Sequence, residues 1–355
     1  MMLKPLSPKT LEKRYKETNI TMDLLEQLQT YFLCFSNLYG VISGKEAFQI
    51  YSFYEPEGVK KVKFRRFAEV AARDTKPYVI VDIAELYDEK PGSDYLIINK
   101  KLISEGYYKW YMVYQVVNAR QNKPFYMPEK KVLLKWEKDQ FWLSDAAIRY
   151  RQFIENLRSS GTVINKYTDK EKKLLDINGD SASGKKLDEL LLINDFEQFD
   201  IKHIKNEKVK DKRLEQASIP VSEKILNETE LEIRAGSVIP ESDGLRVIMD
   251  KLVYEYGAVF TEQTIRTFTD LFVSLNNTSC MWLSRGHSPE EIRKEQGTGG
   301  HPQISFGPNI RELISKGEFD IDDIRKAFAV HGIDIDESDF YINSGRKPID
   351  LQSMG

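Results

Sequence analysis

The sequence predicts a mainly α-helical protein of the α+β class, in which a winged-helix-like N-terminal module with a β-hairpin is followed by helical domains. Two observations carry this prediction. Apolar residues recur three and four residues apart over most of the chain, which is the spacing of amphipathic helices. The runs YVIVDI at 78–83 and YLII at 95–98 are rich in β-branched and aromatic residues, and the turn-rich run DEKPGSD at 88–94 lies between them.

The first two helices are predicted from their caps. Residues 1–19 are polar, and we expect them to form a loose lead-in. A helix is predicted over 21–39, closed by Gly40, which tolerates the backbone conformation that ends a helix. Ser43 and Glu46 then form a capping box that starts a second helix.

The third predicted helix, KKVKFRRFAEVAAR at 60–73, has one apolar and one basic face. A strand over 62–67 is a minor alternative, because those letters also alternate loosely. Three helices followed by a hairpin is the order of a winged helix, in which the third helix is the recognition element. The residues expected to contact nucleic-acid phosphates are Lys60, Lys61, Lys63, Arg65, Arg66 and Arg73. An equally weighted alternative is a solvated charged face on a fold that is reused for protein contacts.

Aromatic residues dominate the remainder of this first region, which we assign to 20–160. A helix is predicted over 105–119, and its aromatic face is interpreted as core rather than as a base-stacking platform. Trp136, Phe141 and Trp142 form a second aromatic cluster, expected to pack against the winged module. A further amphipathic helix is predicted over 146–157.

Residues 161–215 are the most polar part of the chain and are predicted to be a helical connector between domains. The run GDSASGKK at 179–186 matches a phosphate-binding loop in letters only. The segment before it is charged rather than a buried strand, and Lys186 stands where the motif needs a serine or threonine. We therefore expect no nucleotide cofactor and interpret the run as a loop before a helix at 186–196.

Residues 216–355 are predicted to form an acidic helical domain. Helices are expected over 245–256 and 261–277 as an antiparallel hairpin, with further helices at 309–315 and 320–330. The net charge is +5 over residues 1–150, +1 over 151–220 and −9 over 221–355. This asymmetry favours nucleic-acid contact by the basic front and contact with a protein partner by the acidic back.

The run NNTSCMWLSRGHSPEEI at 276–292 is expected to be a structural clasp. A helix must end near its first residues and a capped helix begins at its SPEE letters, so the short connection between them needs hydrogen-bond donors for its backbone. A buried tryptophan would keep water away from those groups. The residues assigned to the clasp are Trp282, Arg285, His287, Ser288 and Glu291.

Metal sites and catalysis are not indicated. The four histidines and two cysteines lack the close pairs of a zinc site. Asp334, Asp336 and Asp339 resemble half of a calcium loop, but its glycine and final glutamate are missing. Cys280 and His287 could form a nucleophile and base, yet no third orienting group is identifiable, so an enzyme is the less favoured reading.

No apolar run approaches the ~20 residues of a membrane span, and the N-terminal run has no apolar core of a secretory signal. We therefore expect a cytoplasmic protein that does not contact membranes. The predicted function is that of a non-enzymatic binding or regulatory protein. The alternative is a protein-only adaptor, including a mobile-element protein that docks on a host protein.

Three runs carry a family resemblance: NLYGVIS at 37–43, KPFYMPEKKVLLKW at 123–136 and NNTSCMWLSRGHSPEE at 276–291. They resemble a group of uncharacterised bacterial proteins, typical of Gram-positive genomes and their mobile elements, in which similar motifs occur in this order. Many such proteins end in a zinc-binding SEC-C tail. In this chain no cysteine follows Cys280, so neither that zinc site nor a partner recruited by it is expected.

Overall fold

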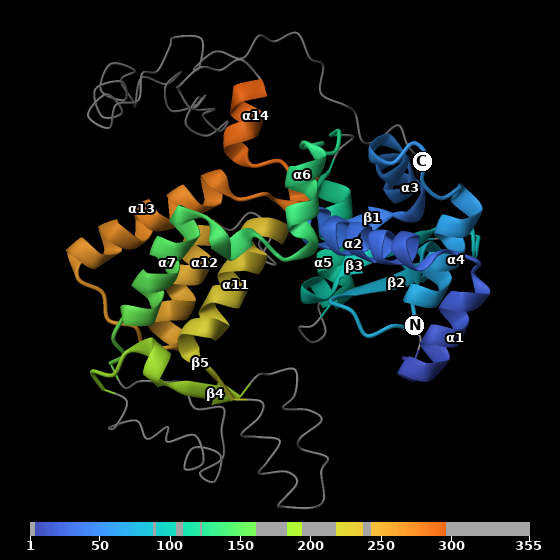
Figure 1. Ribbon diagram of the computed structural model, residues 1–355. Helices are drawn as coiled ribbons and strands as arrows, with labels where there is room; N and C mark the ends of the chain where they lie inside the picture. Colours follow the sequence, from blue (N-terminus) through green and yellow to red (C-terminus); the bar gives the residue numbers. More distant parts are fainter. Residues whose placement is uncertain are drawn as a thin grey trace, which may run out of the picture. The chain divides into compact units, whose positions relative to one another are not determined.

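The computed structural model describes residues 4–87, 90–103, 109–120, 123–160, 183–193, 218–236 and 243–295, and every structural statement below concerns these residues. The chain divides into two compact units, Met1–Pro289 and Glu290–Gly355. The predicted helices at 309–315 and 320–330, the aspartate-rich tail and most of the 161–215 connector lie outside the described residues. As predicted, the fold is mostly helical with a small antiparallel sheet (Figure 1).

The chain begins with a helix that the sequence interpretation missed. Residues Pro8–Glu17 form α1, whose N-terminus is capped by the Ser7 side chain. Leu11 and Tyr15 are buried, and the Tyr15 ring stacks on Phe67 at 5.8 Å between centroids. The loose lead-in predicted over 1–19 is therefore wrong for residues 8–17, because two apolar side chains four residues apart are enough to dock an otherwise polar helix.

The next three helices match the prediction: α2 (Met22–Tyr39), α3 (Gly44–Tyr54) and α4 (Lys61–Ala71). The capping box before α3 is present in both directions, with Glu46 N–H 3.2 Å from Ser43 Oγ and Ser43 N–H 3.1 Å from the Glu46 carboxylate. The helical conformation of 61–71 excludes the alternative strand at 62–67.

The predicted hairpin is also present and belongs to a three-stranded antiparallel sheet of order β1-β3-β2. Strand β2 (Tyr78–Asp82) pairs with β3 (Tyr95–Asn99), and the 3-10 turn η1 (Ile83–Glu85) follows β2. The unpredicted strand β1 (Val41–Ser43), between α2 and α3, pairs with the other edge of β3. Three residues are too few to show the period-two pattern of a strand.

The two faces of this sheet contribute to different hydrophobic cores, as expected from the alternation of side chains along a strand. Ile42, Ile80 and Ile97 join the core of α1 to α4. Val41, Val81, Leu96 and Ile98 join a second core with α5 (Lys109–Ala119), α11 (Val221–Ala235) and Trp282. The sheet is therefore covered on both faces.

The burial of side chains on α5 differs from the prediction that its aromatic face is core. Met112, Val113 and Val116 are its buried residues, whereas Tyr111 and Tyr114 are exposed. The reading of the aromatic stripe as core is therefore wrong for Tyr111 and Tyr114, although Trp110 does pack against the core. Three aliphatic side chains provide the buried contact with the sheet instead.

The segment after α5 connects the cores. It contains α6 (Lys130–Leu133), η4 (Leu134–Glu137) and η5 (Phe141–Leu143), while the 3-10 turn η2 (Lys100–Ile103) lies before α5. Trp136 packs into the core formed with α1 to α4, as expected. Phe141 and Trp142 instead pack into the helical core that follows, so the expectation is wrong for these two residues.

A third core is formed by α7 (Asp145–Asn156), α11, α12 (Gly244–Asp250) with its π-helical extension η7 (Lys251–Glu255), and α13 (Glu262–Thr278) (Figure 1). Helix α11 was not predicted. The helix predicted at 186–196 is wrong over its described part, which is the 3-10 turn η6 (Leu187–Glu189) and strand β4 (Leu191–Ile193) paired with β5 (Ser218–Pro220). No helix in the described ranges is long and apolar enough to cross a membrane.

Candidate functional site

The basic face of α4 is exposed. Five of the six residues predicted to contact phosphates lie on this surface: Lys60, Lys61, Lys63, Arg65 and Arg66. Arg73 is half-buried, and its Nε–H donates to the Lys4 carbonyl at 3.4 Å. The structure therefore brings five predicted residues to one surface and places the sixth against the N-terminal segment.

Some of these cations already have partners. The Lys63 ammonium donates to the Asn19 carbonyl at 2.9 Å. The Arg65 guanidinium donates to the Gly92 carbonyl at 2.6 Å and lies 3.4 Å from the Glu69 carboxylate. Within the described ranges, no hydrogen bond or ion pair involves the side chains of Lys60, Lys61 and Arg66. These three cations are available to an anionic ligand.

Helix α1 extends the basic surface. It runs antiparallel to α4, since Leu6 N–H donates to the Arg73 carbonyl at one end of the pair and Lys63 reaches the Asn19 carbonyl at the other. Lys9 and Lys13 on α1 are exposed, and neither has a polar side-chain partner among the described residues. The sequence interpretation missed their contribution because it took this segment as loose.

The hairpin loop beside α4 has the opposite charge. Its acidic side chains order the loop: the Asp82 carboxylate accepts from Ala84 N–H at 3.0 Å and from Gly92 N–H at 2.7 Å. Asp94 accepts from the amides of Lys45 and Tyr95. The described part of the loop thus places carboxylates, which repel phosphate, beside the basic surface of α4.

The clasp residue Trp282 lies at the C-terminal end of α2. Its ring is fully buried, and its indole N–H donates to the Asn37 carbonyl at 3.0 Å. The Arg234 guanidinium lies 4.2 Å from the ring centroid and donates to the same carbonyl. The last carbonyls of a helix have no hydrogen-bond donor within the helix. Here the side chains of Trp282 and Arg234, which come from distant segments, both donate to the Asn37 carbonyl.

The side chain of Arg120 donates to backbone carbonyls at the end of α2 and at Trp282. No sequence feature indicated this role. Its fully buried guanidinium donates to the carbonyls of Tyr39 at 2.5 Å, Val41 at 2.6 Å and Trp282 at 3.2 Å. Burial, and secondarily the charge of Arg285, lower the pKa of Arg120. The three carbonyl dipoles and the negative end of the α2 dipole stabilise this buried cation.

We expected the side chain of Arg285 or His287 to donate to the backbone left open between Asn276 and Ser288, and Arg285 does not do so. Its backbone is left-handed, with φ 52°, and its guanidinium lies 4.5 Å from the Phe125 ring centroid and 3.6 Å from the Glu46 carboxylate. Arg285 reaches the backbone through its own carbonyl, which accepts from Tyr126 N–H at 3.0 Å. The expectation for Arg285 is therefore wrong, because Arg120 lies beside the carbonyls of Tyr39, Val41 and Trp282 and donates to them.

The remaining clasp residues lie close by in sequence. His287 is buried, with its ring 5.3 Å from that of Tyr126, and its carbonyl accepts from Met281 N–H at 3.1 Å. Ser288 is buried directly before α14 (Pro289–Glu295), which begins where the sequence predicted. Glu291 lies in the first turn of α14.

Residues of the runs 37–43, 123–136 and 276–291, which the sequence analysis singled out, meet at the end of α2. The Asn37 side chain donates to the Trp136 carbonyl at 2.8 Å, and Tyr39 Oη donates to the Tyr126 carbonyl at 2.8 Å. Gly40, with φ +70°, faces Trp282 so closely that an added Cβ would lie 2.4 Å from the ring. Residues of the first two runs and Trp282 of the third therefore form one packing centre.

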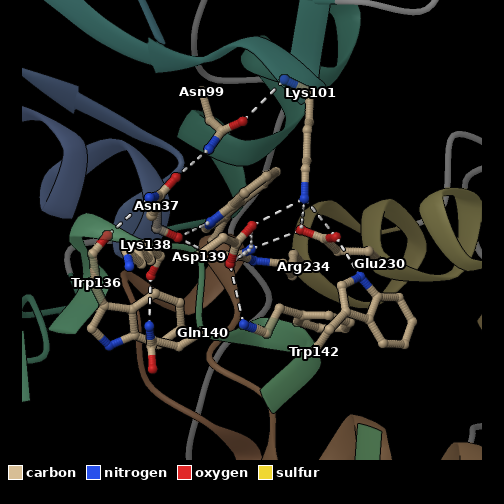
Figure 2. Close-up of polar contacts among 12 residues, drawn as sticks. Asn37, Asn99, Lys101, Trp136, Lys138, Asp139, Gln140, Trp142, Glu230 and Arg234 are labelled. Carbon is tan, nitrogen blue, oxygen red and sulfur yellow. Dashed lines mark hydrogen bonds and ion pairs between the residues drawn. The ribbon is translucent and has the colours of Figure 1, made fainter. Parts of the chain in front are cut away.

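A cluster of four charged side chains, two of them buried, adjoins this centre (Figure 2). Arg234 lies 2.8 Å from the Glu230 carboxylate and 3.0 Å from that of Asp139, and the Lys101 ammonium lies 2.7 Å and 3.0 Å from the same two groups. The indole of Trp142 donates to Glu230 at 3.0 Å. The partly exposed Lys101 and Asp139 thus balance the fully buried Glu230 and Arg234, whose charges would be strongly unfavourable if unpaired.

The Asp139 carboxyl shows how these charges depend on one another. Burial alone raises its pKa, but the charges of Arg234 and then Lys101 outweigh burial and hold the pKa well below its ordinary value. Asp139 is therefore ionised at neutral pH. The cluster joins α2, η2, the segment before η5 and α11, which is a structural role.

No known protein family, curated protein or solved structure matches this chain. Among the described ranges, no three His, Cys, Asp or Glu side chains lie where they could hold a metal ion together. Of the groups described above, the exposed surface of α1 and α4 is the one whose unpaired charges face outward, and it is the candidate site.

Proposed function

We propose that the protein is a non-enzymatic cytoplasmic regulatory protein that binds duplex nucleic acid through α4 and the adjoining α1. The observation that carries this proposal is the set of exposed cations on α4 that have no partner in the described chain: Lys60, Lys61 and Arg66. Cations of this kind neutralise phosphates and release condensed counterions, which drives sequence-independent binding.

The order of the elements supports this use of α4. Helix α2, strand β1, helices α3 and α4 and the β2–β3 hairpin follow one another, and β1 closes the sheet against β3. This order is that of a winged helix, whose third helix enters the major groove. The acidic hairpin loop supports a mode in which α1, rather than the wing, accompanies α4 on the phosphates.

The acidic helical region supplies the second half of the proposal. The 221–355 segment has a net charge of −9, and a like-charged phosphate backbone would repel it. We propose that it contacts a protein partner while the basic surface holds the nucleic acid.

The test is salt-dependent binding of the full chain to a mixed-sequence DNA duplex. We expect the combined Lys60→Ala, Lys61→Ala and Arg66→Ala variant to bind more weakly at every sequence. Its slope of log affinity against log salt should decrease by roughly 0.9 for each lost phosphate contact.

A matched control removes three positive charges elsewhere, at Lys131, Arg246 and Arg266, which are exposed and paired with neighbouring carboxylates. This control should bind like the unmodified chain. Equal weakening of both triple variants would reduce the effect to net charge and overturn the assignment of α4. Absence of binding by the unmodified chain at about 50 mM salt would overturn nucleic-acid binding and favour the protein-only adaptor.

A further inference from the structure

The exposed face of α4 contains one uncharged side chain among its charged ones. Val62, in the first turn of the helix, is 65% exposed, and the other exposed residues of α4 are Lys61, Lys63, Arg65, Arg66 and Glu69. A lone exposed valine is common on protein surfaces. Its position is informative here, because the first residues of a recognition helix are those that contact base edges.

Val62 and Arg66 are four residues apart and therefore lie on the same side of α4. Like Lys61, they are unengaged, whereas Lys63 donates to the Asn19 carbonyl and Arg65 is held by Gly92 and Glu69. A bound guanidinium would have to break its contacts to reach a base. Arg66 can present its planar donor pair without that rearrangement.

We infer, resting on the proposed function, that Val62 and Arg66 read base identity in the major groove of B-form DNA, where Val62 contacts a thymine methyl group and Arg66 a guanine. A short β-branched side chain cannot donate to phosphate, but its methyl groups match the thymine C5-methyl. The free guanidinium matches guanine O6 and N7 as a bidentate donor.

The helix spacing sets the separation of the two bases. Side chains at i and i+4 have Cβ atoms about 5–6 Å apart, and successive base pairs of B-DNA rise about 3.4 Å. The preferred site therefore places the thymine and the guanine roughly two base pairs apart. Double-stranded RNA is excluded as the ligand of this reading, since its major groove is too narrow for side chains and uracil has no methyl group.

The experiment selects duplexes from a random DNA library with the full chain and then measures affinity for the selected site. Replacement of the selected thymine by deoxyuridine removes one methyl group and should weaken binding by about fourfold. Replacement of the guanine by another base should weaken binding by roughly 5- to 150-fold.

Two variants assign these effects to residues. Val62→Ala should bind thymine and deoxyuridine duplexes equally, whereas the control Val273→Ala, at an exposed valine of α13, should retain the preference for thymine. Arg66→Lys keeps the positive charge but loses the planar pair of donors, so it should reduce the preference for guanine more than the overall affinity. Far-UV circular dichroism establishes that each variant is folded.

The outcomes separate this inference from the proposed function. Salt-dependent binding without enrichment of any sequence would overturn base reading by α4 and leave nucleic-acid binding intact. Equal affinity for an RNA duplex would have the same meaning. A preference for thymine that persists in Val62→Ala would remove Val62 from the site, and no binding at low salt would overturn both proposals.

Discussion

Replacement of Trp282 by alanine tests the packing centre at the end of α2. The side chain is fully buried and belongs to the core that covers the second face of the sheet. Its removal costs about 3–5 kcal/mol as a large-to-small change. The Arg234 guanidinium, 4.2 Å from the ring centroid, also loses a desolvated cation–π contact of about 2 kcal/mol. The expected total, on the order of 5 kcal/mol, approaches the whole stability of many domains.

Trp282→Phe separates packing from hydrogen bonding. Phenylalanine keeps most of the ring and removes the indole N–H that donates to the Asn37 carbonyl. Because Arg234 donates to the same carbonyl, the carbonyl retains a partner. The expected loss is therefore about 1 kcal/mol, the value of a typical hydrogen bond.

Urea unfolding of the full chain, followed by far-UV circular dichroism, measures these differences. Phe53→Ala is the control, because this ring is 70% exposed and its removal should change the free energy of unfolding by less than about 0.5 kcal/mol. If Trp282→Ala unfolded at the same urea concentration as the unmodified chain, the tryptophan would not be holding the packing centre together, and the reasoning would be refuted.

Two further predictions concern the same region. Gly40→Ala should lower the free energy of unfolding by roughly 2–5 kcal/mol, since it combines a left-handed backbone with a clash against Trp282. Gly184→Ala, with φ +80° and open space around its Cβ, should incur only the backbone part of this loss in the same urea unfolding assay. Equal losses in the two variants would exclude the clash. The lowered pKa of Asp139 means that the folded state binds this proton less readily than the unfolded state does, so the stabilisation is complete above about pH 4 and is lost as the pH falls further. Asp139→Asn should flatten that acid decline in urea titrations from pH 6 to 2, and an unchanged decline would show that other groups cause it.

Local signals predicted the parts of the fold that local chemistry determines. The Ser43–Glu46 capping box, the apolar spacing of α4 and the turn before β3 each depend on residues within one or two turns of each other, and the structure has all three. Strand β1 and helix α1 were missed, because one is very short and the other displays only two apolar residues toward its neighbour.

The buried polar groups could not have been predicted in the same way. Glu230 and Arg234 lie four residues apart on α11, a pattern that usually marks an exposed helix face. Their burial is possible only because Lys101 and Asp139 arrive from distant segments to balance the charges. Arg120 is likewise fixed by the backbone carbonyls of Tyr39, Val41 and Trp282, which lie about 80 and 160 residues away, and no spacing in the sequence reveals this.

The C-terminal end of α2 packs against residues that the ribosome synthesises much later, and this affects how the chain folds during translation. The indole of Trp282 bonds a carbonyl 245 residues earlier, at Asn37. At about 5–20 residues per second, translation separates these two residues by roughly 10 to 50 seconds. During that interval the last turn of α2 and the second face of the sheet lack Trp282, which packs against them in the folded protein. The N-terminal region therefore reaches its native packing only when the clasp has emerged, and a nascent chain arrested before that point would expose an apolar sheet face to chaperones.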